Sequence, residues 1–277
     1  MTDLSTIGTV PARGPRRLSA LQGLRRGATR VRLSLAAGLR ADEPVTLALA
    51  ATLALSFYFM VLPGVDLAVS ALFFSAEGFA LAQDPLLRAL RKSSSGVLGL
   101  MLVGLIGEMA IGLWRGRGRI RGYARRAAVL VAGLALGSGL LVNGLLKSLW
   151  GRARPIQIEG FGGDAEFTAA WRISDNCADN CSFVSGEASS AAWMVAVVVL
   201  MVPAEHRRWA LPLVIAYATA LSLNRLAFGG HFLSDVLLSW ALTGLVLAVL
   251  HRLTLTCPRT ARRMRRARRT AVVATAG

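Results

Sequence analysis

Histidine and cysteine are scarce in this sequence, which has three of each among its 277 residues. The cysteines are Cys177, Cys181 and Cys257, and no histidine stands near the first two. Their spacing matches none of the usual zinc-binding patterns, even when Asp175 or Asp179 is counted as a further ligand. A metal site at these cysteines is therefore disfavoured.

Acidic residues are also in the minority, since 15 Asp and Glu stand against 32 Lys and Arg, which gives a formal net charge of +17. At the same time 54% of the residues are hydrophobic. A soluble globular domain rarely combines the two properties. The apolar and the basic residues must therefore be segregated along the chain.

Long apolar stretches divide the chain, each close to the roughly 20 residues with which a helix crosses a hydrocarbon core of about 30 Å. Six of them lie at residues 45–63, 96–114, 127–146, 188–203, 209–227 and 234–251. We therefore predict an all-α fold, a polytopic membrane protein with six transmembrane helices in one bundle over residues 44–252. Basic segments at residues 1–43 and 253–277 flank this domain.

The basic residues are concentrated in alternate connections, and cytoplasmic segments are the ones that retain positive charge. Residues 1–43, 115–126, 204–208 and 252–277 together hold 24 of the 32 Lys and Arg. This alternation predicts a multi-pass protein of the bacterial plasma (inner) membrane with both termini in the cytoplasm. The opposite face, toward the periplasm or the outside, keeps few cations.

No cleavable signal peptide is apparent, because the first apolar run begins after about 44 polar and basic residues and no small-residue cleavage pattern follows it. Leucines recur among arginines in residues 16–39, which fits either a helix on anionic headgroups or a disordered basic tail. The stretch Arg259–Arg269 is more typical of a topology and lipid-surface signal than of nucleic-acid binding. We expect anionic headgroups as partners of these tails, and no nucleic acid.

Cys177 and Cys181 both lie in the 147–187 loop, which the charge pattern places outside, whereas Cys257 falls inside. Two cysteines four residues apart in an oxidising space can close a small disulfide. We favour this disulfide over the metal site, with two free thiols as the remaining alternative.

The first of three polar fragments on the outer side reads KSLWGRARP, from Lys147 to Pro155. Lys147 ends the third apolar stretch, and Arg154 follows on a short segment that proline stiffens. Arg offers a planar fork to two phosphate oxygens and Lys a mobile point charge, so the pair suits a phosphate dianion. The alternative is that both side chains extend to the membrane interface without a ligand.

The second fragment, Ser185, Gly186 and Glu187, precedes a further apolar stretch and has the pattern of a helix N-terminus. Exposed N–H groups and the positive end of the helix dipole attract an anion there. The alternative is ordinary capping, with Glu187 complementing the dipole.

The third fragment runs from Arg225 to Asp235 and reads RLAFGGHFLSD. His231 and Asp235 are four residues apart and share a helical face. A carboxylate one turn from an imidazole can hold its tautomer and leave the other nitrogen free to attack phosphorus. A satisfied structural pair is the alternative, but the other histidines, His206 and His251, map to the cytoplasmic side.

Taken in order, the fragments read K-x6-RP, SG with an ionisable residue, and R-x5-H-x3-D. This set resembles the signature of the type 2 phosphatidic acid phosphatase superfamily, and the apolar pattern matches its integral-membrane lipid phosphatase branch over roughly residues 45–251. The resemblance implies hydrolysis of a lipid phosphomonoester or pyrophosphate without metal or cofactor. It offers phosphatidic acid, phosphatidylglycerol phosphate, undecaprenyl pyrophosphate and lipid A phosphates as substrates.

The resemblance also assigns roles to the matching residues. His231 would be the nucleophile that forms a phosphohistidine, and Asp235 would orient it. Basic side chains, a hydroxyl and a backbone N–H would bind the phosphate oxygens. These phosphate-binding residues are Lys147, Arg154, Ser185, Gly186 and Arg225.

Glu187 departs from the family pattern, in which a histidine usually follows Ser-Gly, and Val184 stands where proline is usual. We expect Glu187 to be the general acid that protonates the leaving oxygen, which would shift activity toward lower pH. A different substrate or an inactive site is the alternative. Two other functions stay open: a lipid phosphotransferase that uses the same histidine, and a catalytically degenerate lipid-binding or transport protein.

Overall fold

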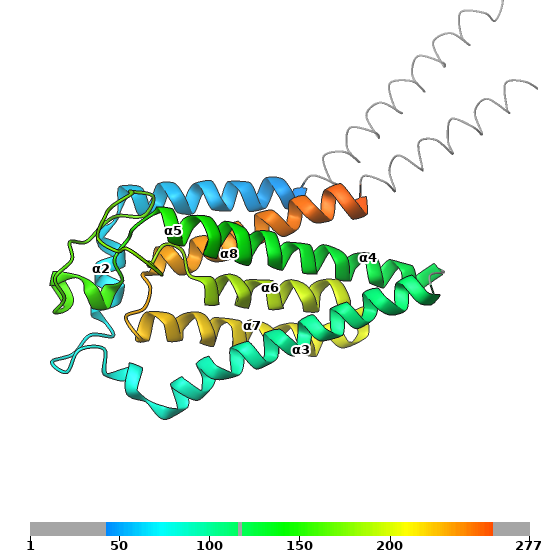
Figure 1. Ribbon diagram of the computed structural model, residues 1–277, viewed down its shortest axis with the longest axis horizontal. Helices are drawn as coiled ribbons and strands as arrows, with labels where there is room; N and C mark the ends of the chain where they lie inside the picture. The colour runs from blue at the N-terminus through cyan, green and yellow to red at the C-terminus, as the bar shows by residue number, and fades with distance from the viewer. Residues whose placement is uncertain (1–42, 116–117, 257–277) are drawn as a thin grey trace, which may run out of the picture. The chain divides into compact units, whose positions relative to one another are not determined.

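A computed structural model describes residues 43–115 and 118–256 (Figure 1). The chain divides into two units, Met1–Glu43 and Pro44–Gly277, and almost all of the first lies outside the described residues. The interfacial helix considered for residues 16–39 therefore stays a prediction. Cys257 and the basic stretch Arg259–Arg269 also lie outside the described part of the chain.

The described chain is nearly all helical, with only two isolated β-bridges. Its elements are the Glu43–Val61 helix, α2 (Gly64–Ala71), η1 (Ala80–Gln83), α3 (Pro85–Arg115), α4 (Gly118–Gly133), η2 (Leu134–Leu146), α5 (Lys147–Leu149), η3 (Pro155–Gln157), η4 (Glu159–Phe161), α6 (Gly186–Met201), α7 (Ala204–Ala227), α8 (Leu233–His251) and η5 (Arg252–Thr256). The fold class predicted from the sequence, an all-α polytopic membrane protein, is confirmed.

The predicted number of six spans is not confirmed, because five helices in the described residues are long and apolar enough to cross a membrane. The predicted fourth span, residues 188–203, corresponds to α6, which has only 16 residues. At about 1.5 Å per residue a helix of this length is shorter than a hydrocarbon core of about 30 Å. Instead, α6 packs against α4, η2, α7 and α8 and buries Trp193 and Met194 among them.

The second span also begins earlier than predicted, at Pro85 instead of residue 96. Asp84 accepts a hydrogen bond from the N–H of Leu87 at 2.9 Å, and proline occupies the first helical position. Both features are typical of a helix start. As a result Arg91 and its neighbours lie on the first turns of α3 and not in a loop.

Hydroxyl groups connect the central helices below the polar end of the bundle. Ser189 of α6 hydrogen-bonds to Ser138 of η2 at 2.6 Å and to Thr243 of α8 at 2.7 Å. All three side chains are buried, so the bonds satisfy groups that would otherwise be costly inside the bundle. They fix η2, α6 and α8 against one another directly beneath the residues described next.

Candidate active site

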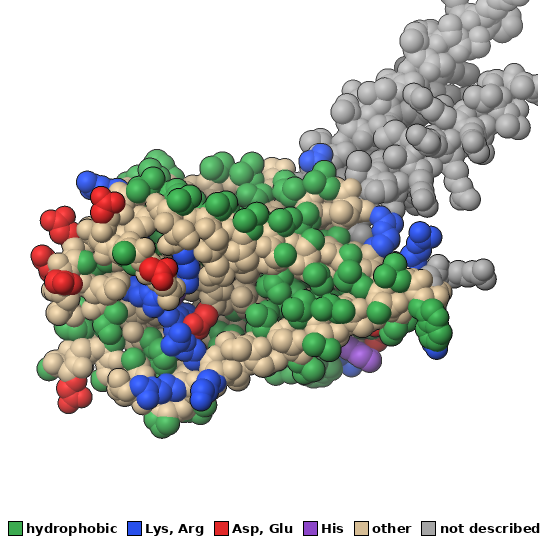
Figure 2. Space-filling model, in the orientation of Figure 1, with side chains coloured by type: hydrophobic (Ala, Val, Ile, Leu, Met, Phe, Trp, Pro, Cys, Tyr) green, Lys and Arg blue, Asp and Glu red, His purple; other side chains and the backbone are tan. Residues whose placement is uncertain are grey.

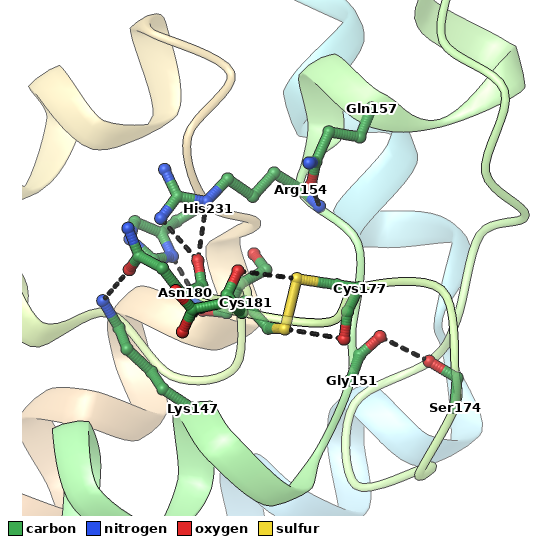
Figure 3. The surroundings of a disulfide bond; sticks show 11 residues. Lys147, Gly151, Arg154, Gln157, Ser174, Cys177, Asn180, Cys181 and His231 are labelled. Carbon is green, nitrogen blue, oxygen red and sulfur yellow. Dashed lines mark hydrogen bonds between the residues drawn. A yellow bond between two sulfur atoms is a disulfide. The ribbon is translucent and has the colours of Figure 1, made fainter.

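The predicted site residues come from separate parts of the chain and meet at one end of the bundle. Lys147 follows η2, Arg154 lies in the loop beyond it, and Arg225 lies in the last turn of α7. His231 occupies the short loop between α7 and α8. The three cations are close enough to act electrostatically on the His231 ring. Figure 3 shows Lys147, Arg154 and His231 around Asn180.

The His231 side chain is buried, and its Nδ1 lies 2.8 Å from the carbonyl oxygen of Ser182. A ring nitrogen that bonds to a carbonyl must carry the proton, so Nε2 keeps its lone pair. Burial, and then the positive charges of Arg225, Lys147 and Arg154, lower the pKa of His231 well below its ordinary 6.5. The ring is therefore neutral near pH 7, which is the form that a nucleophile needs.

Asp235 lies close to the imidazole but does not hydrogen-bond to it. Its Oδ2 lies 3.9 Å from His231 Nδ1, which is too long for a hydrogen bond. The same Oδ2 accepts bonds from Ser182 Oγ at 2.5 Å and from the N–H of Phe232 at 2.9 Å. Ser182 thus binds Asp235 through its hydroxyl and His231 through its carbonyl, so this residue links the two side chains by hydrogen bonds.

Arg152 is the site residue that sequence reasoning missed, and its side chain is fully buried. Its Nη1 donates to Asp235 Oδ1 at 2.7 Å and its Nη2 to Asp66 Oδ2 at 2.9 Å. The guanidinium also lies over the ring of Phe232, 4.3 Å from the centroid. Apart from Asp66, the stretch GVDLAVSA of α2 contains only apolar and small residues. A single carboxylate in such a stretch was the sign in the sequence that Asp66 has a buried partner.

Lys147 and Arg154 are both bound to Asn180, another residue that the sequence did not single out. Lys147 Nζ donates to Asn180 Oδ1 at 3.2 Å, while Nε and Nη2 of Arg154 donate to the Asn180 carbonyl at 3.2 and 2.7 Å. Burial, and next the nearby Arg91, lower the pKa of Arg154 below its ordinary value. A bound anion would offset that cost, because it restores a counter-charge.

The predicted disulfide between Cys177 and Cys181 is confirmed, with the two Cα atoms 5.6 Å apart. It closes the small loop that presents Asn180 to Lys147 and Arg154 (Figure 3). The covalent link restricts this loop beside the cations. Within residues 43–115 and 118–256, no group of three His, Cys, Asp or Glu side chains could hold a metal ion.

The predicted helix start at Ser185 is confirmed. Its side chain accepts from the N–H of Ala188 at 3.3 Å, and α6 begins at Gly186. A Cβ on Gly186 would lie 2.6 Å from Asn143 Oδ1, so a larger residue here would displace the Asn143 side chain of η2. The approach places the start of α6 next to Lys147 in a small cavity that both line.

Glu187 forms ion pairs with two arginines. Its Oε1 lies 3.0 Å from Nε of Arg91 and 3.5 Å from Nη1 of Arg225. In this arrangement the carboxylate is an acceptor. Nε and Nη1 of the buried Arg225 have no hydrogen-bond partner among the described residues. Buried donors without a hydrogen bond are costly, so Nε, together with Nη1, whose ion-pair partner is Glu187 at 3.5 Å, marks a position where a ligand oxygen fits.

A cavity of about 970 Å³ opens beside these residues and is lined by Arg154, Glu187 and Arg225 on one side and by the start of α3 on the other. Figure 2 shows Lys and Arg side chains gathered around this part of the surface, with acidic ones between them. The site can therefore hold an anion much larger than phosphate.

Comparison with known proteins places this geometry in context. Residues 128–259 match the model of the PAP2 superfamily. The chain is 44% identical over 131 residues to a lipid A 4'-phosphatase of Rhizobium etli, covering 47% of this chain and 51% of that protein. A protein of the same name from Francisella tularensis subsp. novicida is 38% identical over 114 residues, or 41% of this chain and 51% of that one. The chain thus spans about half the length of these curated relatives.

Among solved structures, a transmembrane PAP2 type phosphatidylglycerolphosphate phosphatase from Bacillus subtilis is similar at 19% identity and a TM-score of 0.48. The similarity covers 76% of this chain and 94% of that one.

Proposed function

We propose that this chain, whose residues 128–259 form a PAP2 superfamily domain, is a membrane lipid phosphatase that works without a metal ion. The observation that carries the proposal is the buried Arg225, whose Nε and Nη1 lack hydrogen-bond partners among the described residues. A phosphate oxygen would satisfy these donors and leave phosphorus close to His231. Lys147 and Arg154 would bind the remaining oxygens, as the sequence predicts.

The neutral His231 acts as the nucleophile. Its Nε2 lone pair forms a bond to phosphorus while the bond from phosphorus to the lipid oxygen breaks, which yields a phosphohistidine and the dephosphorylated lipid. Water then cleaves the phosphohistidine and releases inorganic phosphate. The cations stabilise the charge of both transition states in the role that Mg²⁺ has in other phosphoryl-transfer enzymes.

Glu187 is our candidate for the proton donor to the leaving lipid oxygen. A phosphate bound by Arg225 would take over the contact that Glu187 now makes with it. A carboxyl group released from that contact beside the leaving oxygen is in place to donate a proton to it. Ser185 and the N–H of Gly186 would add hydrogen bonds to the phosphate at the start of α6.

The substrate that we propose is a phosphate group of lipid A, because the curated relatives carry the name lipid A 4'-phosphatase. The charge pattern of the connections supports a site at the outer face of a bacterial inner membrane, with cytoplasmic termini. Phosphatidic acid, phosphatidylglycerol phosphate and undecaprenyl pyrophosphate are the lipids against which this choice is tested.

The test is phosphate release by the purified protein in detergent and EDTA from each of the four lipids. We expect release from lipid A by the wild type and by His206→Gln, a matched control in the first turn of α7, and none by His231→Gln. An acid-labile phosphate adduct should form on the wild type and on His206→Gln but not on His231→Gln. Phosphate that appears on an acceptor instead of in solution would identify a phosphotransferase. If none of the four lipids releases phosphate, the proposal is overturned.

A further inference from the structure

The cavity beside His231 has two cationic sides. At about 970 Å³ it is far larger than a single phosphate requires and is comparable to pockets that enclose whole drug-sized ligands. One side carries Arg154 and Arg225 of the proposed phosphate site. The other carries Arg91 and Lys92, on the first turns of α3. Neither of these two belongs to the phosphate-binding set.

Charge in this cavity is strongly unbalanced. Among the residues that line it, five are Lys or Arg and one, Glu187, is acidic. Arg88 is turned back onto its own loop, where its Nε donates to the carbonyl of Ala82 at 2.8 Å and its Nη2 donates to Gln83 Oε1. Arg91 and Lys92 are exposed to the cavity and to solvent. They are the groups that a second anion could reach.

Glu187 connects the two sides. A single oxygen, Oε1, is 3.0 Å from Arg91 Nε and 3.5 Å from Arg225 Nη1. The Glu187 carboxylate therefore lies between Arg91 of α3 and Arg225 of the proposed phosphate site. One carboxylate cannot neutralise the cations on both sides, and an anion beyond Glu187 would gain from the uncompensated charge.

We propose that Arg91 and Lys92 form a second anion-binding subsite for a lipid whose polar head carries two anionic groups, one cleaved at His231 and the other held on α3. The proposal rests on the phosphatase function proposed above and deepens it. A bis-phosphorylated sugar headgroup has the required chemistry, since the sugar spans the cavity between the two phosphates. The same subsite would accept a soluble bis-phosphate, so the experiment includes both sources.

The kinetic experiment compares two lipids that share the cleaved phosphate, one with and one without a second phosphate on the sugar. We expect Arg91→Gln and Lys92→Gln together to raise KM for the bis-phosphorylated lipid about tenfold, with kcat nearly unchanged, and to leave the mono-phosphorylated lipid within about twofold. Arg91→Lys, which keeps the charge, should retain most of the low KM of the wild type for the bis-phosphorylated lipid. Arg172→Gln, an exposed arginine that does not line this cavity, is the matched control.

A binding experiment judges the subsite independently of turnover. Glucose 1,6-bisphosphate and glucose 6-phosphate are titrated against the detergent-solubilised protein by calorimetry. We expect the wild type and His231→Gln to prefer the bisphosphate, and the Arg91 and Lys92 variants to lose that preference. Equal affinity of the wild type for both sugars, or equal effects of the variants on both, would overturn the subsite. If the preference holds but no lipid is hydrolysed, only the phosphatase function fails.

Discussion

Asp235 and Arg152 form an ion pair in which neither side chain is exposed, with Oδ1 2.7 Å from Nη1. Arg152 is paired equally closely with Asp66 of α2, at 2.9 Å. Because Asp235 also accepts a hydrogen bond from the Ser182 hydroxyl, and the Ser182 carbonyl bonds to His231, a continuous set of polar contacts runs from α2 to His231. We expect this set to position the imidazole.

Asp66→Asn tests this positioning role. The change keeps the shape but leaves Arg152 with one carboxylate, and loss of a partner in a buried ion pair costs about 3 kcal/mol. We expect a lower midpoint of thermal unfolding in detergent and a fall in kcat that exceeds any change in KM. Asp164→Asn, at an exposed residue of the 147–187 loop, is the control and should alter neither. An unchanged midpoint for Asp66→Asn would show that the pair has no net role in stability.

The pH dependence of the reaction should follow His231. Its neutral form attacks and its protonated form cannot, so the rate falls as pH drops through the His231 pKa. Since burial and the cations place that pKa well below 6.5, kcat/KM should stay high through mildly acidic pH and fall only beyond it. A kcat/KM that already falls as the pH is lowered to about 7 would contradict this role of His231.

Removing a neighbouring cation should move the same pKa upward. Arg154→Gln takes away one of the charges that oppose protonation of His231. We expect the ring of His231 to titrate closer to 6.5, measured by NMR on protein with labelled histidine, independently of activity. Variants of His206 and His251 assign the other two signals. An unchanged or lower pKa would show that the charge of Arg154 does not help to set it.

Opening the 177–181 loop should weaken substrate binding. Cys177→Ser with Cys181→Ser removes the constraint that holds the Asn180 carbonyl on Arg154, so the guanidinium loses its fixed orientation. We expect KM to rise several-fold, and stability to fall by about 2 kcal/mol if loop entropy accounts for the effect. Asn180→Ala keeps the carbonyl and should raise KM less. A reductant should reproduce the double variant in the wild type and do nothing further to the variant itself.

Glu187→Gln separates proton donation from ion pairing. If Glu187 is the general acid, turnover of a lipid phosphate should fall about 100-fold, whereas an aryl phosphate, whose leaving oxygen needs no proton, should lose little. The activity of the wild type on the lipid should also favour the acidic side. An equal loss for both substrates would assign Glu187 to the ion pairs with Arg91 and Arg225 only.

Several parts of the site could be predicted because they depend on neighbours in sequence. Ser185 caps α6 since a hydroxyl next to a helix start reaches the N–H three residues on. Cys177 and Cys181 are close enough in sequence for a loop to bring them together. The count of six spans is not confirmed because of α6, since a helix that is apolar on all sides can be enclosed by other helices as well as cross a membrane.

The contacts that hold His231 in place could not be derived from neighbours in sequence. Asp66 and Arg152 are 86 residues apart, and nothing in the local pattern says which buried carboxylate meets which guanidinium. Asn180 likewise reaches Lys147 across 33 residues. Such pairs depend on how helices pack, and packing is decided by the whole set of side chains between them.

The sequence by itself determined that this is a membrane protein, where α6 begins and which cysteines form the disulfide. It also singled out the basic residues and the histidine of the candidate site. Each of these follows from composition or from residues a few positions apart. Only the tertiary structure decided that Ser182 and not Asp235 bonds to His231, and that Glu187 lies between Arg91 and Arg225. The physical reason is that hydrogen bonds and ion pairs are settled within a few ångströms, a precision that only the packed bundle supplies.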